Sequence, residues 1–408
     1  MASQSPSTRP VLASLGTLLV DCFSWTDPST LKPLPDKPPI QRLGGGGLYA
    51  LVGARIWLGP EALRILVDGG TDSHADGEKS LRDDEGKSEG DGFPTELKIQ
   101  LDELGEYMWV WKKGRTLKAS IEYCGDERTF TYLSIPPIRR ASDLLSTALY
   151  GAEYVHVVAS PSDCLQLVDD LEQLQIESGA APSEIWRPKI VYEPHPKNCR
   201  GEELGALREV LSKVHVLSPN HEELAAFLSD SIQVSASPNS STTTLSKKIE
   251  SHIRSLMPSR GIGPDGNGAI VVRSGAMGAC VGRRKHRNVA GNDEQYSSEE
   301  GLEIDWVPAY WTQEEKGEVR DVTGAGNSFL GGLVAGLHFT KDDAREATLY
   351  ASVSASYVVQ QFGLPILSSG TQEDGGEHGD VRVKNEVWNR ESPWMRLERL
   401  KARMMDIS

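Results

Sequence analysis

The sequence has few cysteines, and their spacing suggests no pairing. The five cysteines lie far apart, with no CxxC spacing and no histidine at metal-ligand spacing. This absence argues against a structural zinc site and a disulfide framework. We therefore predict a reduced, cytoplasmic protein.

Long apolar runs and basic clusters are also missing. No stretch approaches the ~20 consecutive apolar residues that span a bilayer, so we expect no membrane partner. The 43 Lys and Arg against 58 Asp and Glu give a net charge of -15, and no long basic face is present. This balance argues against a nucleic-acid partner. The 408 residues suffice for one large α/β domain with insertions, or for two domains.

Two familiar phosphate-binding motifs fail on inspection. The single GKS, at Gly86, lacks the glycine five positions earlier that a P-loop needs, because Leu81 stands there. The segment 261–266 satisfies GxGxxG, but it contains Pro264 and precedes a strand pattern at 269–273. We interpret it as a turn and exclude a dinucleotide fingerprint.

The segment richest in possible chemistry is DVTGAGNSFL, residues 321–330, which runs into a helical apolar pattern. The first N–H groups of such a helix lack intrahelical partners. Gly324, Ala325, Gly326 and Asn327 therefore form a plausible anion hole for a phosphate. The alternative is a glycine-rich turn in which Asn327 caps the helix and nothing binds.

Several other segments predict a mostly parallel α/β sheet. A buried strand is expected at 11–20, a glycine loop and helix at 44–59, and a strand–helix–strand unit between 154 and 192. Three alternating segments, 107–111, 116–123 and 128–134, predict an antiparallel meander.

Polar segments without apolar periodicity are expected to be disordered. They comprise a leader at 1–10, insertions at about 71–92, 231–246 and 283–300, and the polar tail that begins at 367. A charged terminal helix is expected within the rest of 367–408.

Four motifs, in order along the chain, resemble the PfkB (ribokinase-like) carbohydrate and nucleoside kinases. DVTGAGNSF resembles the family's DTxGAGDxF, and GGGGLYALVGARIWLG resembles its first glycine-rich signature. NHEE at 220–223 resembles its NxxE motif, and RSGAMG at 273–278 resembles its nucleotide hairpin. The pattern is most similar to the fungal maintenance-of-killer branch.

The resemblance implies a three-layer α/β/α sandwich at 11–366, with a mostly parallel central sheet and a small β lid at about 105–136. An edge sheet without a lid function is the alternative for 105–136. The resemblance also implies ATP and Mg²⁺ as cofactors, a sugar or nucleoside as substrate, and a possible homodimer through the lid.

It also implies roles for individual residues. Substrate contacts would come from Asp21, Gly45 and Gly46. Nucleotide contacts would come from Asn220, Arg273, Gly275, Gly278 and Thr323, and Glu223 would hold Mg²⁺ through water. The alternative for Asn220 and Glu223 is a plain helix cap.

The sequence departs from the family at two decisive positions. Asn327 stands where the family has the aspartate that takes the proton from the substrate, and Ala50 stands where an asparagine reads a substrate hydroxyl. Two hypotheses follow: an ATP-dependent kinase of a sugar or nucleoside, and a pseudokinase that keeps the fold and has lost transfer.

Overall fold

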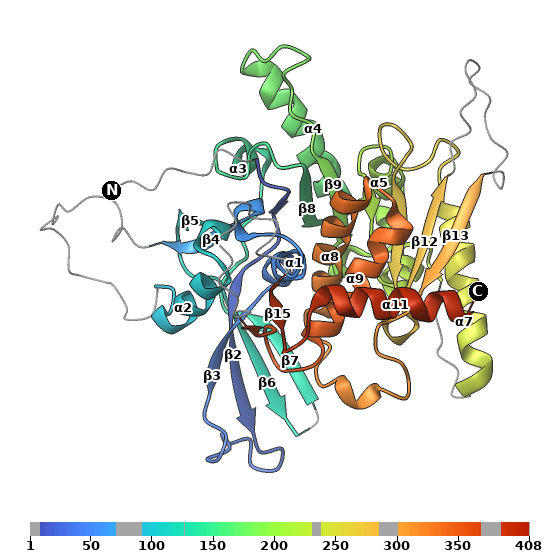
Figure 1. Cartoon of the computed structure of the whole chain (residues 1–408). Coiled ribbons are helices and arrows are strands. Elements are labelled where there is room, and N and C mark those ends of the chain that lie inside the picture. The colour runs from blue at the N-terminus through green and yellow to red at the C-terminus, as the bar shows by residue number, and fades with distance from the viewer. Residues whose placement is uncertain are drawn as a thin grey trace, which may run out of the picture.

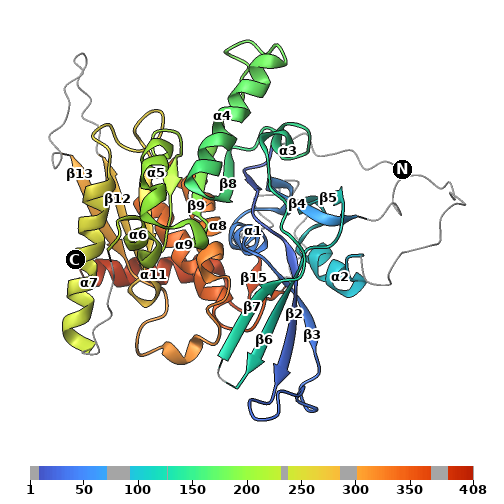
Figure 2. The ribbon, with the colours of Figure 1, turned by 180° about the vertical axis from the view of Figure 1, so that it is seen from behind.

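The computed structural model describes residues 9–70, 92–125, 127–230, 238–284, 301–368 and 385–407. Within them, one large sheet of nine strands carries helices on both faces (Figure 1, Figure 2). The predicted three-layer α/β/α arrangement with a mostly parallel central sheet is confirmed. None of the helices in these ranges combines the length and apolarity needed to cross a lipid bilayer.

The central sheet has the order β13-β12-β11-β10-β9-β8-β1-β4-β5. Its strands are β1 Leu12–Ser14, β4 Leu63–Gly70, β5 Trp109–Lys113, β8 Tyr154–Ala159, β9 Lys189–Pro194, β10 Val216–Leu217, β11 Ala269–Arg273, β12 Ala279–Arg284 and β13 Leu302–Val307. All neighbours are parallel except β12, which is antiparallel to both β11 and β13. The carboxyl ends of the parallel strands therefore share one edge, where such sheets place their ligands.

The helices form the two outer layers, and alternating strand residues face one layer or the other. Val271 packs in the cluster with α1, α8 and α9, whereas Ile270 and Val272 pack in the cluster with α4 to α7. The first layer contains α1 Gly46–Arg55, α2 Thr95–Leu104, α8 Ala325–Thr340, α9 Ala344–Val358 and α11 Pro393–Ile407. The second contains α3 Ala141–Leu145, α4 Pro161–Glu177, α5 Leu204–Val210, α6 His221–Phe227 and α7 Pro238–Leu256.

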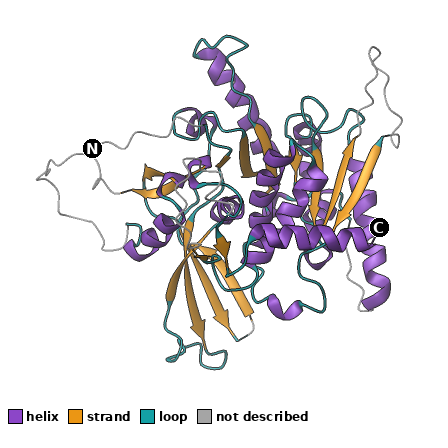
Figure 3. Ribbon diagram, in the orientation of Figure 1, coloured by secondary structure: helices purple, strands orange, loops and turns teal. Residues whose placement is uncertain are grey.

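A second, four-stranded sheet projects from one end of the central sheet (Figure 3). It has the order β3-β2-β6-β7, and its strands are β2 Leu19–Thr26, β3 Ile40–Gly44, β6 Lys118–Cys124 and β7 Glu127–Tyr132. A short pair, β14 Leu367–Ser368 and β15 Val387–Trp388, precedes α11. Within the described residues, short 3₁₀ turns lie at Pro60–Ala62, Glu106–Met108, Pro196–Asn198, Gly201–Glu203, Gly275–Met277 and Lys316–Glu318.

Helices α1 and α8 lie in direct backbone contact, because glycines occupy their interface. A side chain at Gly331 would overlap the carbonyl oxygen of Ala50, and one at Gly53 would overlap the backbone of Ser328. This close packing places the amino-terminal ends of both helices side by side. A Cβ atom at Gly46, in the first turn of α1, would lie 2.9 Å from the side-chain nitrogen of Asn327 in α8.

Two strand predictions were wrong. The predicted strand at 11–20 is two strands in different sheets, because the chain leaves the central sheet after Ser14 and passes against the start of α1 at Gly16. The predicted meander at 107–134 loses its first strand, since β5 pairs in parallel with β4 in the central sheet. Alternation of apolar and polar residues predicts a strand but does not predict which strand it pairs with. The smaller sheet is completed by β2 and β3 in place of β5.

The predicted loop at 231–246 was wrong for its second half. Helix α7 begins at Pro238, and Ile249 and Ile253 bury its apolar side, so burial further along the helix outweighs the Ser/Thr-rich start. Residues 283 and 284 complete β12. The remaining predicted disorder, at 1–8, 71–91, 231–237, 285–300 and 369–384, lies outside the described residues.

Candidate functional site

The predicted anion hole would lie in the glycine turn before α8. Gly324 has a φ of 78°, a left-handed conformation that favours glycine, and Thr323 donates its N–H to Asp321 at 3.0 Å. Among the described residues, nothing accepts the N–H groups of Gly326 and Asn327. These donors lie at the positive end of a sixteen-residue helix, which suits an anion.

A cavity of about 690 Å³ opens beside this turn. Its walls come from the start of α8, the end of α9, the hairpin between β11 and β12, and the loop 309–322. The hairpin needs glycine at both predicted positions: Gly275 and Gly278 have φ values of 56° and 88°. Asn220, Arg273, Gly275, Gly278, Ala325 and Gly326 all line the cavity.

Arg273, at the end of β11, lies between the cavity and two buried carboxylates. One terminal nitrogen lies 2.8 Å from Oε1 of Glu193. The other lies 3.4 Å from Oε2 of Glu223 and donates to the carbonyl of Ser218 at 3.1 Å. A Cβ atom added at Gly326 would lie 2.5 Å from the guanidinium, so Arg273 also contacts the anion hole.

Glu193 joins Arg273 to the position of the missing base. The side-chain nitrogen of Asn327 donates to Oε2 of Glu193 at 2.8 Å, and Nε2 of His156 lies 3.2 Å from the same oxygen. Burial alone would raise the pKa of Glu193, but Arg273, His156 and Asn327 outweigh it and lower the pKa to about 2. Since an ionised carboxylate only accepts, Nε2 of His156 carries a proton, and its Nδ1 lies 3.0 Å from Oγ of Ser14.

Asn220 and Glu223 form a capping box at the start of α6. The Asn220 side chain accepts the N–H of Glu223 at 2.8 Å, and Oε2 of Glu223 accepts the N–H of Asn220 at 2.7 Å. Burial raises the pKa of Glu223, and Arg273 offsets this only in part. In this structure Asn220 and Glu223 therefore cap helix α6, as the alternative for these two residues predicts.

This arrangement does not fit the hydrated Mg²⁺ that the family resemblance implies. Oε2 of Glu223 already accepts from Asn220 and Arg273, and both oxygens of Glu193 are engaged as well, so of these four oxygens only Oε1 of Glu223 has no partner among the described residues. Among the described residues, no cluster of three or more His, Cys, Asp or Glu is suited to a metal ion. A cation placed here would also face the positive guanidinium of Arg273.

The predicted substrate residues lie on the other side of Asn327. Asp21 sits within β2, only 7% exposed, with its carboxylate against Gly44, and neither Gly45 nor Gly46 lines the 690 Å³ cavity. The first N–H groups of α1, from Gly47 and Leu48, donate to the carbonyl of Thr17 at 2.9 and 3.2 Å.

The Tyr49 ring occupies the space between Gly324 and Asp21. A Cβ atom at Gly324 would overlap the ring, which is 5% exposed. Burial raises the pKa of Tyr49, and the nearby carboxylates of Asp21 and Asp321 raise it further. Ala50 is fully buried and offers no polar group.

Sequence reasoning missed Tyr49 and His156 as parts of the site. Glu193 directly follows the predicted strand–helix–strand unit that ends at 192, at the strand end where such sheets place their ligands. His156 carried a usable signal, because a histidine in the otherwise apolar strand 154–158 needs a buried partner. Tyr49 carried none, since an aromatic residue in an apolar helix is ordinarily core.

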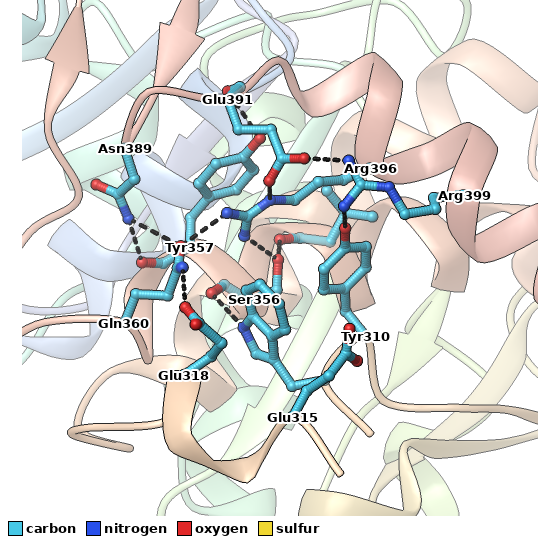
Figure 4. A network of polar contacts seen from close by, with 12 residues as sticks. Tyr310, Glu315, Glu318, Ser356, Tyr357, Gln360, Asn389, Glu391, Arg396 and Arg399 are labelled. Atoms are coloured by element: carbon cyan, nitrogen blue, oxygen red, sulfur yellow. Dashed lines mark hydrogen bonds and ion pairs between the residues drawn. The ribbon is translucent and has the colours of Figure 1, made fainter. Parts of the chain in front are cut away.

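Arg396 supports the far wall of the cavity (Figure 4). Its guanidinium lies 4.9 Å from the ring of Trp311 and 5.2 Å from that of Tyr310, two residues that line the cavity. The indole nitrogen of Trp311 also donates to the carbonyl of Ser356 at 3.0 Å. Helix α11 thereby holds the loop 309–322 against α9.

Comparison with solved structures identifies the architecture. Ribokinase from Giardia lamblia superposes with a TM-score of 0.56 at 16% identity, covering 97% of this chain and 100% of that one. Adenosine kinase from Sinorhizobium meliloti gives 0.53 at 14% identity, covering 87% and 95%. The chain has the ribokinase-like fold. Ribokinase from Arabidopsis thaliana, solved with ribose and ATP, also matches, at 0.52 and 14% identity over 96% and 99%.

Fungal relatives match this ribokinase-like chain over most of its length. An uncharacterized protein of Schizosaccharomyces pombe is 28% identical over 400 residues, covering 96% of this chain and 93% of the relative. Protein MAK32 of Saccharomyces cerevisiae is 26% identical over 342 residues, covering 79% and 78%. No family model matches. The predicted resemblance to the PfkB kinases and their maintenance-of-killer branch is confirmed.

Proposed function

We propose that the protein binds a nucleotide of the ATP class in the 690 Å³ cavity, with its phosphates at the start of α8. The observation that carries the proposal is the position of Arg273, whose guanidinium contacts Gly326 beside two N–H groups without an acceptor among the described residues. A guanidinium and a helix start together suit a phosphate chain. Apolar side chains of Phe329 and Val359 line the same cavity and suit a base.

We further propose that phosphoryl transfer is impaired, so that the protein is a pseudokinase. Asn327 donates its amide hydrogen to Glu193 and cannot take a proton from a substrate hydroxyl. General-base help is typically worth ~10²–10⁴ in rate. Tyr49 also covers the Gly324 side of the turn, where a substrate hydroxyl would approach.

Transfer of the γ-phosphate to a hydroxyl of a sugar or nucleoside is the second candidate function. The favouring observation is Oε2 of Glu193, a carboxylate oxygen 2.8 Å from the Asn327 side chain that replaces the family's base. Its pKa of about 2 makes it a weak base, so turnover through it would be slow. The substrate roles of Asp21, Gly45 and Gly46 and a homodimer through the smaller sheet stay predictions.

The test combines binding with turnover. Isothermal titration with ATP and ADP measures affinity, and ADP formation is followed with a panel of sugars and nucleosides. Nucleotide binding without acceptor-dependent ADP formation supports the pseudokinase, whereas acceptor-dependent ADP formation supports the kinase. Absence of binding by either nucleotide would overturn the proposed function.

The variant that restores a base needs a second change. In Asn327→Asp alone, the new carboxylate would face Glu193, and like charges at that distance raise a pKa. Asn327→Asp combined with Glu193→Gln removes that repulsion. We expect acceptor-dependent turnover to rise in the double variant above both single variants if the substrate region is otherwise intact.

A further inference from the structure

We infer that Arg273 takes the place of the divalent cation in this site, and that the protein binds the polyphosphate of a nucleotide without Mg²⁺. The inference rests on the proposed nucleotide binding and concerns how that site neutralises charge. The observation behind it is that Glu193 and Glu223, the carboxylates nearest this position, are already paired with Arg273 and do not suit a metal ion.

The guanidinium lies where two acidic side chains, one from a strand and one from a helix, meet. Glu193 extends from β9 and Glu223 from the first turn of α6, and Arg273 reaches both, at 2.8 and 3.4 Å. The three side chains are at most 12% exposed, so this charge is held in a low-dielectric environment. A positive charge is thus already built into the position from which these carboxylates would hold a cation.

The same guanidinium lies beside the cavity and the first turn of α8. One terminal nitrogen lies near the Cα of Gly326, in the first turn of α8. Its Nε is buried and has no hydrogen-bond partner among the described residues. A buried unpaired N–H is costly unless a ligand or water completes it, and a phosphate oxygen accepts from an arginine edge with good geometry.

The site also offers a physical reason for excluding the metal. A hydrated Mg²⁺ needs carboxylate lone pairs directed at its waters. Three of the four carboxylate oxygens already accept hydrogen bonds or pair with Arg273, and Arg273 lines the cavity whereas neither glutamate does. A divalent ion that bridged the two glutamates would have to displace the guanidinium and leave it unpaired in a largely buried position, which is strongly unfavourable.

Binding of a fluorescent ADP analogue tests the inference, measured in excess EDTA and in excess MgCl₂. We expect the dissociation constant of the wild-type protein to agree between the two conditions within about threefold. For Arg273→Met we expect a loss of about tenfold or more in EDTA, which MgCl₂ partly restores because the two carboxylates are freed. Arg273→Lys keeps a charge and is the second variant if Arg273→Met does not fold.

Manganese alone supplies a readout that needs no nucleotide. Electron paramagnetic resonance of Mn²⁺ titrated with protein should show no specific binding to the wild type and should show it for Arg273→Met. Arg187→Met is the matched control, because Arg187 forms an exposed ion pair with Glu172; it should behave as the wild type in both assays.

The outcomes separate the inference from the proposed function. Wild-type binding that tightens about tenfold or more with MgCl₂, or specific Mn²⁺ binding by the wild type, overturns the inference and leaves nucleotide binding standing. No nucleotide binding in either condition overturns both.

Discussion

Two arginines beside this cavity differ in which of their guanidinium nitrogens are paired. Arg396 is 1% exposed and uses all three guanidinium nitrogens: Nε to Glu391 at 2.7 Å, and the terminal nitrogens to Ser356 at 2.8 Å and Gln360 at 2.7 Å. It also lies 3.7 Å from the centre of the Tyr357 ring (Figure 4). Arg273 meets two carboxylates but leaves Nε unpaired among the described residues.

This difference distinguishes an arginine that stabilises the fold from one with an unpaired donor beside the proposed ligand site. An arginine whose three guanidinium nitrogens all have partners and that stacks on a ring stabilises the fold. Arg273 instead lines the cavity and has a buried Nε without a partner among the described residues, which water or the proposed phosphate would complete. Arg396 thus supports a wall of the cavity through Trp311, whereas Arg273 itself lines the cavity.

The largest expected effect is the loss of stability in Arg396→Met. Removing the guanidinium leaves Glu391, Ser356 and Gln360 without their shared partner and removes the contact with Tyr357, so we expect a loss of about 5 kcal/mol in the free energy of unfolding. Urea denaturation measures it. Arg187→Met, in an exposed ion pair, should change stability by less than about 1 kcal/mol. A loss of stability in Arg396→Met as small as that in Arg187→Met would show that Arg396 does not stabilise the fold.

Arg273→Met should lose less stability than Arg396→Met and should lose more affinity for nucleotide. Glu193 keeps His156 and Asn327, and Glu223 keeps the N–H of Asn220, so we expect a loss of about 3 kcal/mol. The same urea experiment, run beside nucleotide titration, gives both values. If Arg273→Met loses stability and keeps full affinity for nucleotide, then Arg273 is as structural as Arg396.

Glu193→Gln should change how stability depends on pH. The folded-state pKa of Glu193 is lowered from 4.5 to about 2, so its contribution is present above pH 4.5 and is lost as the pH falls towards 2. The wild type should exceed Glu193→Gln by on the order of 2 kcal/mol near neutral pH, and the gap should close in acid. Melting temperatures between pH 7 and about pH 3 measure it. A constant gap would show that the ionised carboxylate does not stabilise the fold.

Gly326→Ala should give the smallest change in stability. Alanine favours a helix by about 1 kcal/mol, but its Cβ would lie 2.5 Å from the Arg273 guanidinium and displace it. We expect nearly unchanged stability and nucleotide affinity weakened several-fold. Gly205→Ala, in α5 with nothing within 4 Å, is the control and should gain a little stability without affecting binding. Unchanged nucleotide affinity in Gly326→Ala would show that Arg273 does not act together with the predicted anion hole.

Local motifs predicted the parts of the site that adjacent residues build. The turn at Gly324, the hairpin at Gly275 and Gly278 and the cap at Asn220 each depend on backbone conformation within a few residues. The contact between Glu193 and Asn327 joins positions 134 residues apart, and no local pattern encodes it. The same limit explains the partners of β2 and β5, which depend on contacts between distant segments.

The support of the cavity wall by α11 also sets an order of events during synthesis. Arg399 and Arg403 contact Tyr310 from 89 and 93 residues later in the chain. Because a chain leaves the ribosome amino-terminus first, the sheet and the glycine turns are made well before the residues that hold this wall. A nascent chain that ends before Pro393 therefore has the glycine turn without the finished cavity wall. Under the proposed function, we expect nucleotide to protect the protein from proteolysis only once α11 has been made.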